Sequence, residues 1–238
     1  FTADGRELFG SSCSRWQVAP ATNFAAPPRL KRLAFRDLDD STQVCLSSNF
    51  VVLTSLKGSQ VVKQNEIESA TDRWMPTSYG VSSASSDGRW LGIFRAFGSS
   101  LNIYRLPGLE HVAKLTHPAG ISSFEFSPRT GEVAIYSSRA GVEFWSTATW
   151  QRTRALTNFI KVMFTTEGRG WWLTQDSRNA GLYDPDTLHE LLPLPSGASP
   201  LSLSGDGRYL AVSVDARRLQ LWDVTEVQKQ LRDLGLGW

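Results

Sequence analysis

The sequence has few of the residues from which catalytic and metal sites are built. Its 238 residues include only three histidines and two cysteines, and these form no HxH, HExxH or CxxC spacing. It also lacks the G-x-S-x-G elbow of hydrolases and the G-x-x-x-x-G-K-[ST] loop that holds phosphates. We therefore expect no catalytic residue, no metal and no cofactor in this chain.

Charge of one sign and long apolar runs are lacking as well. The 25 basic and 23 acidic residues leave a net charge of +2 and are spread along the chain, whereas a nucleic-acid surface needs clustered basic residues. No apolar stretch approaches the roughly 18 residues that span a membrane. We therefore expect no nucleic-acid partner and no membrane span.

The two cysteines and the first residues bear on the cellular location of the chain and on whether it is part of a longer protein. Cys13 and Cys45 have no metal-ligand spacing, so we expect unpaired thiols. Together with the missing signal-peptide pattern, they favour a cytoplasmic location. Because the chain starts with Phe1 inside a repeat, we expect a monomeric fragment of a longer protein.

Aromatic residues recur at even intervals. Trp16, Tyr104, Trp145, Tyr183 and Trp222 each close a short alternating strand, and the gaps are 88, 41, 38 and 39 residues. The first gap is close to twice the others. A period near 40 that ends on an aromatic residue is typical of a β-propeller blade.

Hairpin turns follow the same period. Glycines after an acidic residue mark most of them, and Asn49 replaces glycine in the second repeat. The predicted turns lie at 5, 49, 88, 131, 168 and 207. The fourth repeat shows four strands, at 123–127, 132–136, 142–146 and 152–156. We therefore predict an all-β fold, a β-propeller of about six four-stranded blades.

Two repeats resemble a known family. Residues 201–223 (LSLSGDGRYLAVSVDARRLQLWD) resemble a WD repeat of the β-propeller family, and so do residues 115–145, in which His117 stands where that family often has its Gly-His histidine. The tail LWDVTEVQKQLRDLGLGW resembles the C-terminus of WD-repeat regions in large bacterial proteins, some with a serine/threonine kinase domain upstream. The resemblance implies a non-catalytic scaffold that binds protein or peptide partners.

The sixth repeat departs from the pattern because a helix replaces its fourth strand. Thr225 and Gln228 have capping-box spacing, and a helix is predicted from Thr225 to Leu234, with Gly235 at its C-terminal cap. We expect a propeller domain over 1–224 and a helix with tail, packed on it, over 225–238. Either a strand upstream of Phe1 completes a six- or seven-bladed ring, or the helix and tail cover the open edge.

The predicted partner-binding face consists of loops that join outer to inner strands or second to third strands. Arginine and aromatic residues are enriched at interface anchors. The candidates are Arg36, Phe97, Arg139, Phe159, Arg178, Asn179 and Arg217. The alternative is a ligand-binding or metal-dependent enzymatic propeller that acts at the central channel. Trp171 and Trp172 are expected to pack between blades.

Overall fold

The structure is a computed structural model that describes most of the chain after residue 50 in full and short stretches of backbone before it. It forms two compact units, residues 1–121 (unit 1) and 122–238 (unit 2), which are considered separately. Among the described residues, no helix has both the length and the apolar character needed to cross a membrane. The described residues are 7–9, 15–19, 29–33, 43–46, 50–63, 75–76, 80–95, 98–137, 139–166, 170–176, 179–204, 206–215 and 217–235.

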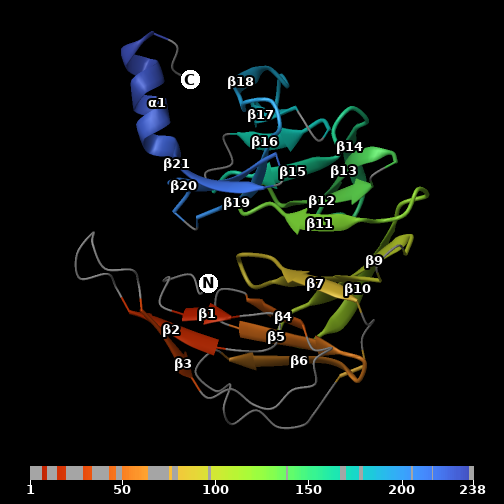
Figure 1. The fold of residues 1–238 in the computed structure, drawn as a ribbon. Helices are drawn as coiled ribbons and strands as arrows, with labels where there is room; N and C mark the ends of the chain where they lie inside the picture. The colour runs from red at the N-terminus through yellow and green to blue at the C-terminus, as the bar shows by residue number, and fades with distance from the viewer. Residues whose placement is uncertain are drawn as a thin grey trace. The chain divides into compact units, whose positions relative to one another are not determined.

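Unit 1 contains three antiparallel sheets, which we call blades one to three (Figure 1). Blade one consists of β1 (Glu7–Phe9), β2 (Arg15–Ala19) and β3 (Arg29–Leu33). Blade two consists of β4 (Gln43–Leu46), β5 (Phe50–Ser55) and β6 (Gly58–Lys63). Blade three consists of β7 (Val81–Ala84), β8 (Trp90–Phe94), β9 (Ser100–Arg105) and β10 (Glu110–Thr116).

Unit 2 contains blades four to six and the helix. Blade four consists of β11 (Ser123–Phe126), β12 (Glu132–Ser137), β13 (Gly141–Ser146) and β14 (Arg152–Leu156). Blade five consists of β15 (Lys161–Phe164), β16 (Trp171–Thr174), β17 (Ala180–Tyr183) and β18 (Glu190–Pro193). Blade six consists of β19 (Ala198–Leu203), β20 (Tyr209–Val214) and β21 (Arg218–Asp223), and α1 (Val224–Asp233) follows it directly (Figure 1).

These sheets confirm the predicted fold class, an all-β chain of propeller blades. In each sheet consecutive strands pair as neighbours, and the strands of blade four lie where the sequence placed them. Three turn glycines, Gly88, Gly131 and Gly207, have φ of 72°, 63° and 75°. Glycine adopts this left-handed conformation without the strain of a side chain. The turns predicted at 5, 49 and 168 lie outside the described residues.

A hydroxyl side chain fixes the first turn of several blades. Ser204 Oγ donates to Asp206 Oδ1 at 2.6 Å and accepts from the Tyr209 amide at 2.8 Å. Ser85 makes the same two bonds in blade three, to Asp87 and from the Trp90 amide. The aspartates of these turns therefore serve local hydrogen bonding, as the sequence predicts.

The core of unit 2 depends on two adjacent tryptophans of β16. Neighbouring residues of a strand point to opposite faces of the sheet. Trp171 packs in a cluster with residues of blade four, and Trp172 packs in a cluster with residues of blade six. Both side chains are fully buried. The predicted packing of both residues between blades is confirmed.

Aromatic stacking joins blade four to blade five. The rings of Phe144 and Trp171 stack with their centroids 4.6 Å apart and their planes at 15°. The Arg154 guanidinium lies 4.0 Å from the Trp171 ring centroid and donates to the Pro185 carbonyl at 2.8 Å. Offset ring stacking and cation–π contacts each stabilise such an interface beyond simple area burial.

The helix begins earlier than the sequence predicts. Asp223, and not Thr225, is the N-cap, because its Oδ1 accepts from the Glu226 amide at 3.1 Å. The other carboxylate oxygen accepts two bonds from Arg208, at 2.9 and 2.8 Å, and these bonds lower the pKa of Asp223. The predicted C-terminal glycine is confirmed, since Gly235 has φ of 74° and donates to the Arg232 carbonyl.

A carboxyl on β11 and a phenol on β12 link blade four to the first strand of blade five. Tyr136 Oη donates to the Val162 carbonyl at 2.7 Å and lies 3.2 Å from Glu125 Oε2. The Phe164 amide donates to the other oxygen of Glu125 at 3.4 Å. Burial raises the pKa of Glu125 to about 7, so this carboxyl holds a proton at mildly acidic pH.

Replacing Trp171 by alanine should lower the free energy of unfolding by about 3–5 kcal/mol, because the cavity would remove the stack that joins two blades. Urea denaturation followed by circular dichroism measures this change. Leu56→Ala is the matched control, since that side chain is 72% exposed and the change should stay within about 0.5 kcal/mol. Equal effects of the two substitutions would contradict this account of the core.

The raised pKa of Glu125 should make stability depend on pH. Folding favours the protonated carboxyl, so its contribution is complete below pH 4.5 and is lost as the pH rises to about 7. Glu125→Gln keeps the neutral form, and its unfolding free energy should exceed that of the wild type by roughly 1–3 kcal/mol at pH 8 and much less at pH 5. A difference that does not change with pH, measured by urea denaturation, would contradict the assignment.

Candidate functional site

Three of the predicted partner-binding residues lie in exposed turns of unit 2. Arg139 lies between β12 and β13, Asn179 between β16 and β17, and Arg217 between β20 and β21. All three are exposed. Each turn joins the second and third strand of its blade, so the three residues occupy equivalent ends of their sheets. Whether they bind a partner stays a prediction.

Contacts within these turns fix the backbone. Asn179 donates from Nδ2 to Asp176 Oδ2 at 2.9 Å and from its amide to Asp176 Oδ1 at 3.0 Å. The Arg139 amide lies 3.4 Å from Ser137 Oγ. These bonds hold the turns in place and leave the Arg139 side chain at the surface.

Phe159 is buried, although the sequence prediction places it on the partner-binding surface. Its side chain is 7% exposed, and its ring packs edge-to-face on Tyr183, with centroids 5.3 Å apart. The connection from β14 to β15 turns this ring inward, to the core of blades four and five. The remaining three predicted residues, Arg36, Phe97 and Arg178, lie outside the described residues.

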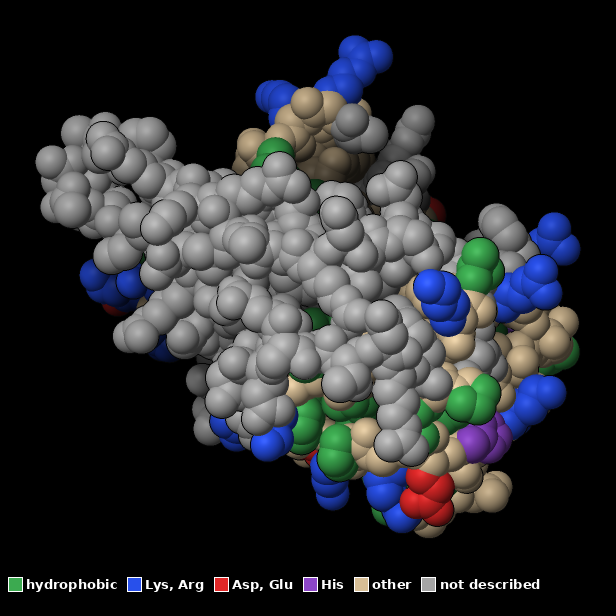
Figure 2. Space-filling view, turned by 90° about the horizontal axis from the view of Figure 1, so that it is seen from below, with side chains coloured by type: hydrophobic (Ala, Val, Ile, Leu, Met, Phe, Trp, Pro, Cys, Tyr) green, Lys and Arg blue, Asp and Glu red, His purple; other side chains and the backbone are tan. Residues whose placement is uncertain are grey.

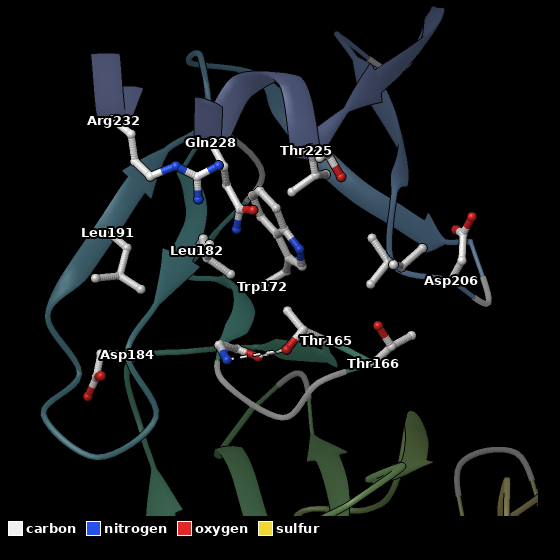
Figure 3. A pocket seen from close by; sticks show the side chains of 14 residues that line it. Thr165, Thr166, Trp172, Leu182, Asp184, Leu191, Asp206, Thr225, Gln228 and Arg232 are labelled. Atoms are coloured by element: carbon white, nitrogen blue, oxygen red, sulfur yellow. Dashed lines mark hydrogen bonds between the residues drawn. The ribbon is translucent and has the colours of Figure 1, made fainter. Parts of the chain in front are cut away.

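A pocket of about 650 Å³ lies at the other ends of the strands, between blades five and six and beneath α1 (Figure 3). Its walls come from the turns after β15 and β19, from β17 and β18, and from one side of the helix. A volume in this range suits a small organic ligand or a short peptide segment. The lining residues are Thr165, Thr166, Gly170, Trp172, Leu182, Asp184, Leu191, Leu203, Asp206, Gly207, Val224, Thr225, Gln228 and Arg232.

The floor of this pocket is apolar. Trp172 and Leu182 are buried members of the core between blades five and six, and Leu191, Leu203 and Val224 pack against the same core. The rim is polar and carries hydroxyl, amide and charged side chains. The accessible lining is therefore mixed, with somewhat more polar than apolar surface.

Two aspartates of the rim serve their own turns. Asp184 Oδ1 accepts from the Asp186 amide at 3.0 Å and from the Thr187 amide at 2.7 Å. Bonds from Thr187 are the main cause that lowers the pKa of Asp184, and the bond from Ser204 is the main cause that lowers the pKa of Asp206. Both carboxylates are therefore ionised at neutral pH.

Gly207 brings the two blades together at the pocket. A Cβ atom built on this residue would lie 2.4 Å from Thr166 Oγ1 of blade five. With φ at 75°, the position is also one that a side chain rarely adopts. The turn of blade six therefore approaches blade five as closely as it does because glycine stands there.

Blade six has an open edge. In blades three to five a fourth strand pairs with the third, whereas the described residues of blade six form three strands, and β21 pairs with β20 alone. The chain continues from β21 into α1. Among the described residues, no strand pairs with the outer edge of β21, where the preceding blades have a fourth strand.

Two leucines on β21 are exposed where the preceding blades bury the equivalent residues. Leu219 and Leu221 are 72% and 69% exposed. Strand register aligns Leu221 with Phe144 of blade four, because they pair with Ala211 and Ala134 respectively. The corresponding residues in blades four and five are all buried: Val142, Phe144, Ala180 and Leu182.

The second strand of blade six shows the same one-sided burial. Along β20, half-buried and buried residues alternate, whereas β16 is buried at every position. One face of blade six is covered by blade five through the core around Trp172. Within unit 2, no further blade covers the other face, which carries Leu219 and Leu221.

The described histidines make ordinary local contacts. His117 is buried, and its Nδ1 accepts from the Ala119 amide at 3.2 Å, a structural hydrogen bond. His111 lies edge-on to the Tyr104 ring at the surface. Within the described ranges, no group of three or more histidine, cysteine or acidic residues is placed to hold a metal ion.

Basic side chains are scattered over the part of the described surface that faces the viewer in Figure 2. On the face drawn in Figure 2, lysine and arginine side chains occur singly or in small groups, separated by side chains of other kinds. This arrangement matches the even spread of charge along the sequence.

Sequence reasoning missed both the pocket and the exposed leucines. The pocket joins Thr165 to Arg232 across 67 residues, and no local pattern indicates that they approach. For Leu219 and Leu221, a signal was present, because the alternating strand is not followed by a fourth strand. The missing strand was recognised, but the exposure of the two leucines that follows from it was not inferred.

Comparisons with known proteins support the fold. No family model matches the chain, and no curated protein matches its sequence. Over 98% of this chain and 77% of the other, the structure is similar to Kuenenia stuttgartiensis hydrazine synthase, with a TM-score of 0.62 and 14% identity. It is also similar to the Cps50 (Swd1) β-propeller domain of Myceliophteria thermophila, with a TM-score of 0.58 and 13% identity, over 73% of this chain and 60% of that one. At such identities the likeness shows the fold alone, which is that of β-propeller blades.

Proposed function

We propose that this chain is a non-catalytic protein-interaction module that binds an extended segment of a partner protein at blade six. The resemblance of its repeats and tail to WD-repeat regions of large bacterial proteins supports a role as the propeller part of such a protein. The similarity to the Cps50 (Swd1) propeller domain is in keeping with this proposal.

The exposed side of β21 is the observation that carries the proposal. Leu219 and Leu221 lie two residues apart, on one side of a strand that has no partner at its outer edge among the described residues. An apolar pair at such an edge is a hazard for a free protein, because it invites pairing with other strands. A partner that covers it turns the hazard into a binding site.

Strand addition is the mode of binding that this edge favours. An extended peptide that adds to a sheet gains main-chain hydrogen bonds along the edge, and alternate side chains give specificity. Blades four and five already show the geometry, since β14 and β18 pair with β13 and β17. The partner segment would occupy the corresponding place beside β21.

Apolar burial would supply much of the affinity. Covering an exposed leucine contributes up to about 1.5–3 kcal/mol, and two leucines stand together here. The predicted loop residues Arg139, Asn179 and Arg217 would add polar contacts at one end of the strands if the partner extends that far. They serve specificity more than affinity, because exposed charges are screened.

The enzymatic alternative has less support. Hydrazine synthase, one of the similar structures, is named as an enzyme, but 14% identity carries no active site across. Its test is a thermal shift with calcium or zinc, since a metal that binds the native state must raise the melting temperature.

Binding at β21 can be tested with a strand peptide. A synthetic peptide of residues 150–158, which contains β14, should slow hydrogen exchange of the amides at 218–222 when it binds. Replacing both Leu219 and Leu221 by aspartate should weaken binding at least tenfold, because the apolar contact is lost and charge is buried. Fluorescence anisotropy of the labelled peptide measures the affinity.

Gln220→Asp is the matched control, because residue 220 lies between the two leucines and on the other side of the strand. It should leave peptide binding nearly unchanged. Failure of the peptide to protect 218–222 would contradict the proposal, and so would equal losses for control and leucine variants. A large drop in melting temperature of the leucine variant without peptide would also contradict it, because the chain itself would then cover this face.

A further inference from the structure

We propose that the pocket beneath α1 is a second binding site and that it takes a ligand with an apolar body and a carboxylate. The site is separate from the β21 edge, because it lies between blades five and six and its lining includes neither Leu219 nor Leu221. The proposal therefore does not depend on strand addition at blade six.

Two donors on α1 point into this pocket. Gln228 and Arg232 are four residues apart, so they share one side of the helix, and Figure 3 shows both side chains directed into the space above Trp172. In the part of the chain that the structure describes, neither side chain has a hydrogen-bond or ion-pair partner. A guanidinium with an amide beside it suits a carboxylate, which arginine binds through two parallel hydrogen bonds.

The floor beneath these donors offers apolar contact, mainly from the half-buried Leu191 and Leu203. Trp172, Leu182 and Leu191 lie below and beside the helix side chains (Figure 3). The 650 Å³ cavity exceeds what a single carboxylate needs and has room for one or two apolar side chains. The ligand would place its apolar body on this floor and its carboxylate at Arg232.

The aspartates of the rim keep their negative charge but are held in their own turns, away from Arg232. In both Asp184 and Asp206, one carboxylate oxygen accepts hydrogen bonds from the residue's own turn. Asp206 also lies close to Arg208, whose charge lowers its pKa further. Arg232 is the charged group of the lining whose side chain has no such partner among the described residues, so it is the one left for a ligand.

Two sources share the proposed ligand chemistry. One is the C-terminus of a peptide that ends in apolar residues, and the other is a free fatty or aromatic acid. The peptide would also meet the hydroxyl groups of Thr166 and Thr225 at the rim. The two sources can be separated by comparing probes of similar size.

Isothermal titration calorimetry with three probes tests the site. The probes are N-acetyl-leucyl-phenylalanine with a free carboxylate, the amide of the same dipeptide, and octanoate. We expect the free acid to bind at least tenfold more tightly than the amide. Octanoate binding as tightly as the dipeptide acid would identify a free acid as the source, and weaker binding would identify a peptide C-terminus.

Arg232→Gln should weaken binding of the free acid at least tenfold and leave binding of the amide unchanged. Lys229→Gln is the matched control, because it removes the same charge from the same helix outside the pocket, and it should not affect either probe. Circular dichroism and melting temperature show that both variants fold.

Three results would overturn the proposal. The first is equal affinity for the acid and the amide, and the second is unchanged affinity in Arg232→Gln. The third is no heat from any of the three probes at millimolar concentration. Because none of these measurements involves β21, a failure here is distinguishable from a failure of the proposed strand addition.

Discussion

The pair Trp171–Trp172 is the constraint on which unit 2 depends. Adjacent residues of a strand must face opposite sides of the sheet, so two consecutive tryptophans need two separate apolar neighbours. Blade four supplies one, through the stack with Phe144, and blade six supplies the other. Blade five is therefore stable only between its neighbours, as expected of repeats that cannot bury both faces alone.

The same requirement explains the exposed side of blade six. Its sequence keeps the pattern of an inner blade. Leu219 and Leu221 stand at the positions that the buried residues Val142 and Phe144 hold in blade four. One face meets blade five, and the other keeps its leucines exposed. The exposure is thus a consequence of the repeat itself, and it gives the open strand the apolar side chains that a partner segment needs.

Much of the fold could be predicted, because period and turn chemistry are local signals. The aromatic spacing and the glycines at 88, 131 and 207 gave the correct strands and turns, since each depends on a few neighbouring residues. Phe159 shows the limit, because its place in a loop says nothing about which way its ring turns. The pocket could not be predicted either, because it depends on how two blades and a helix pack, and no local sequence pattern carries that information.

The change from strand to helix at Asp223 links the two candidate binding sites. Its carboxylate caps α1 and also binds Arg208 in the first turn of blade six, so the helix starts directly at the end of β21. A helix that starts there takes the place in sequence of a fourth strand, which leaves the edge of β21 open. It also brings Gln228 and Arg232 over the gap between blades five and six. Asp223 therefore lies at the junction of the two candidate sites, between the edge strand β21 and the helix that carries the polar wall of the pocket.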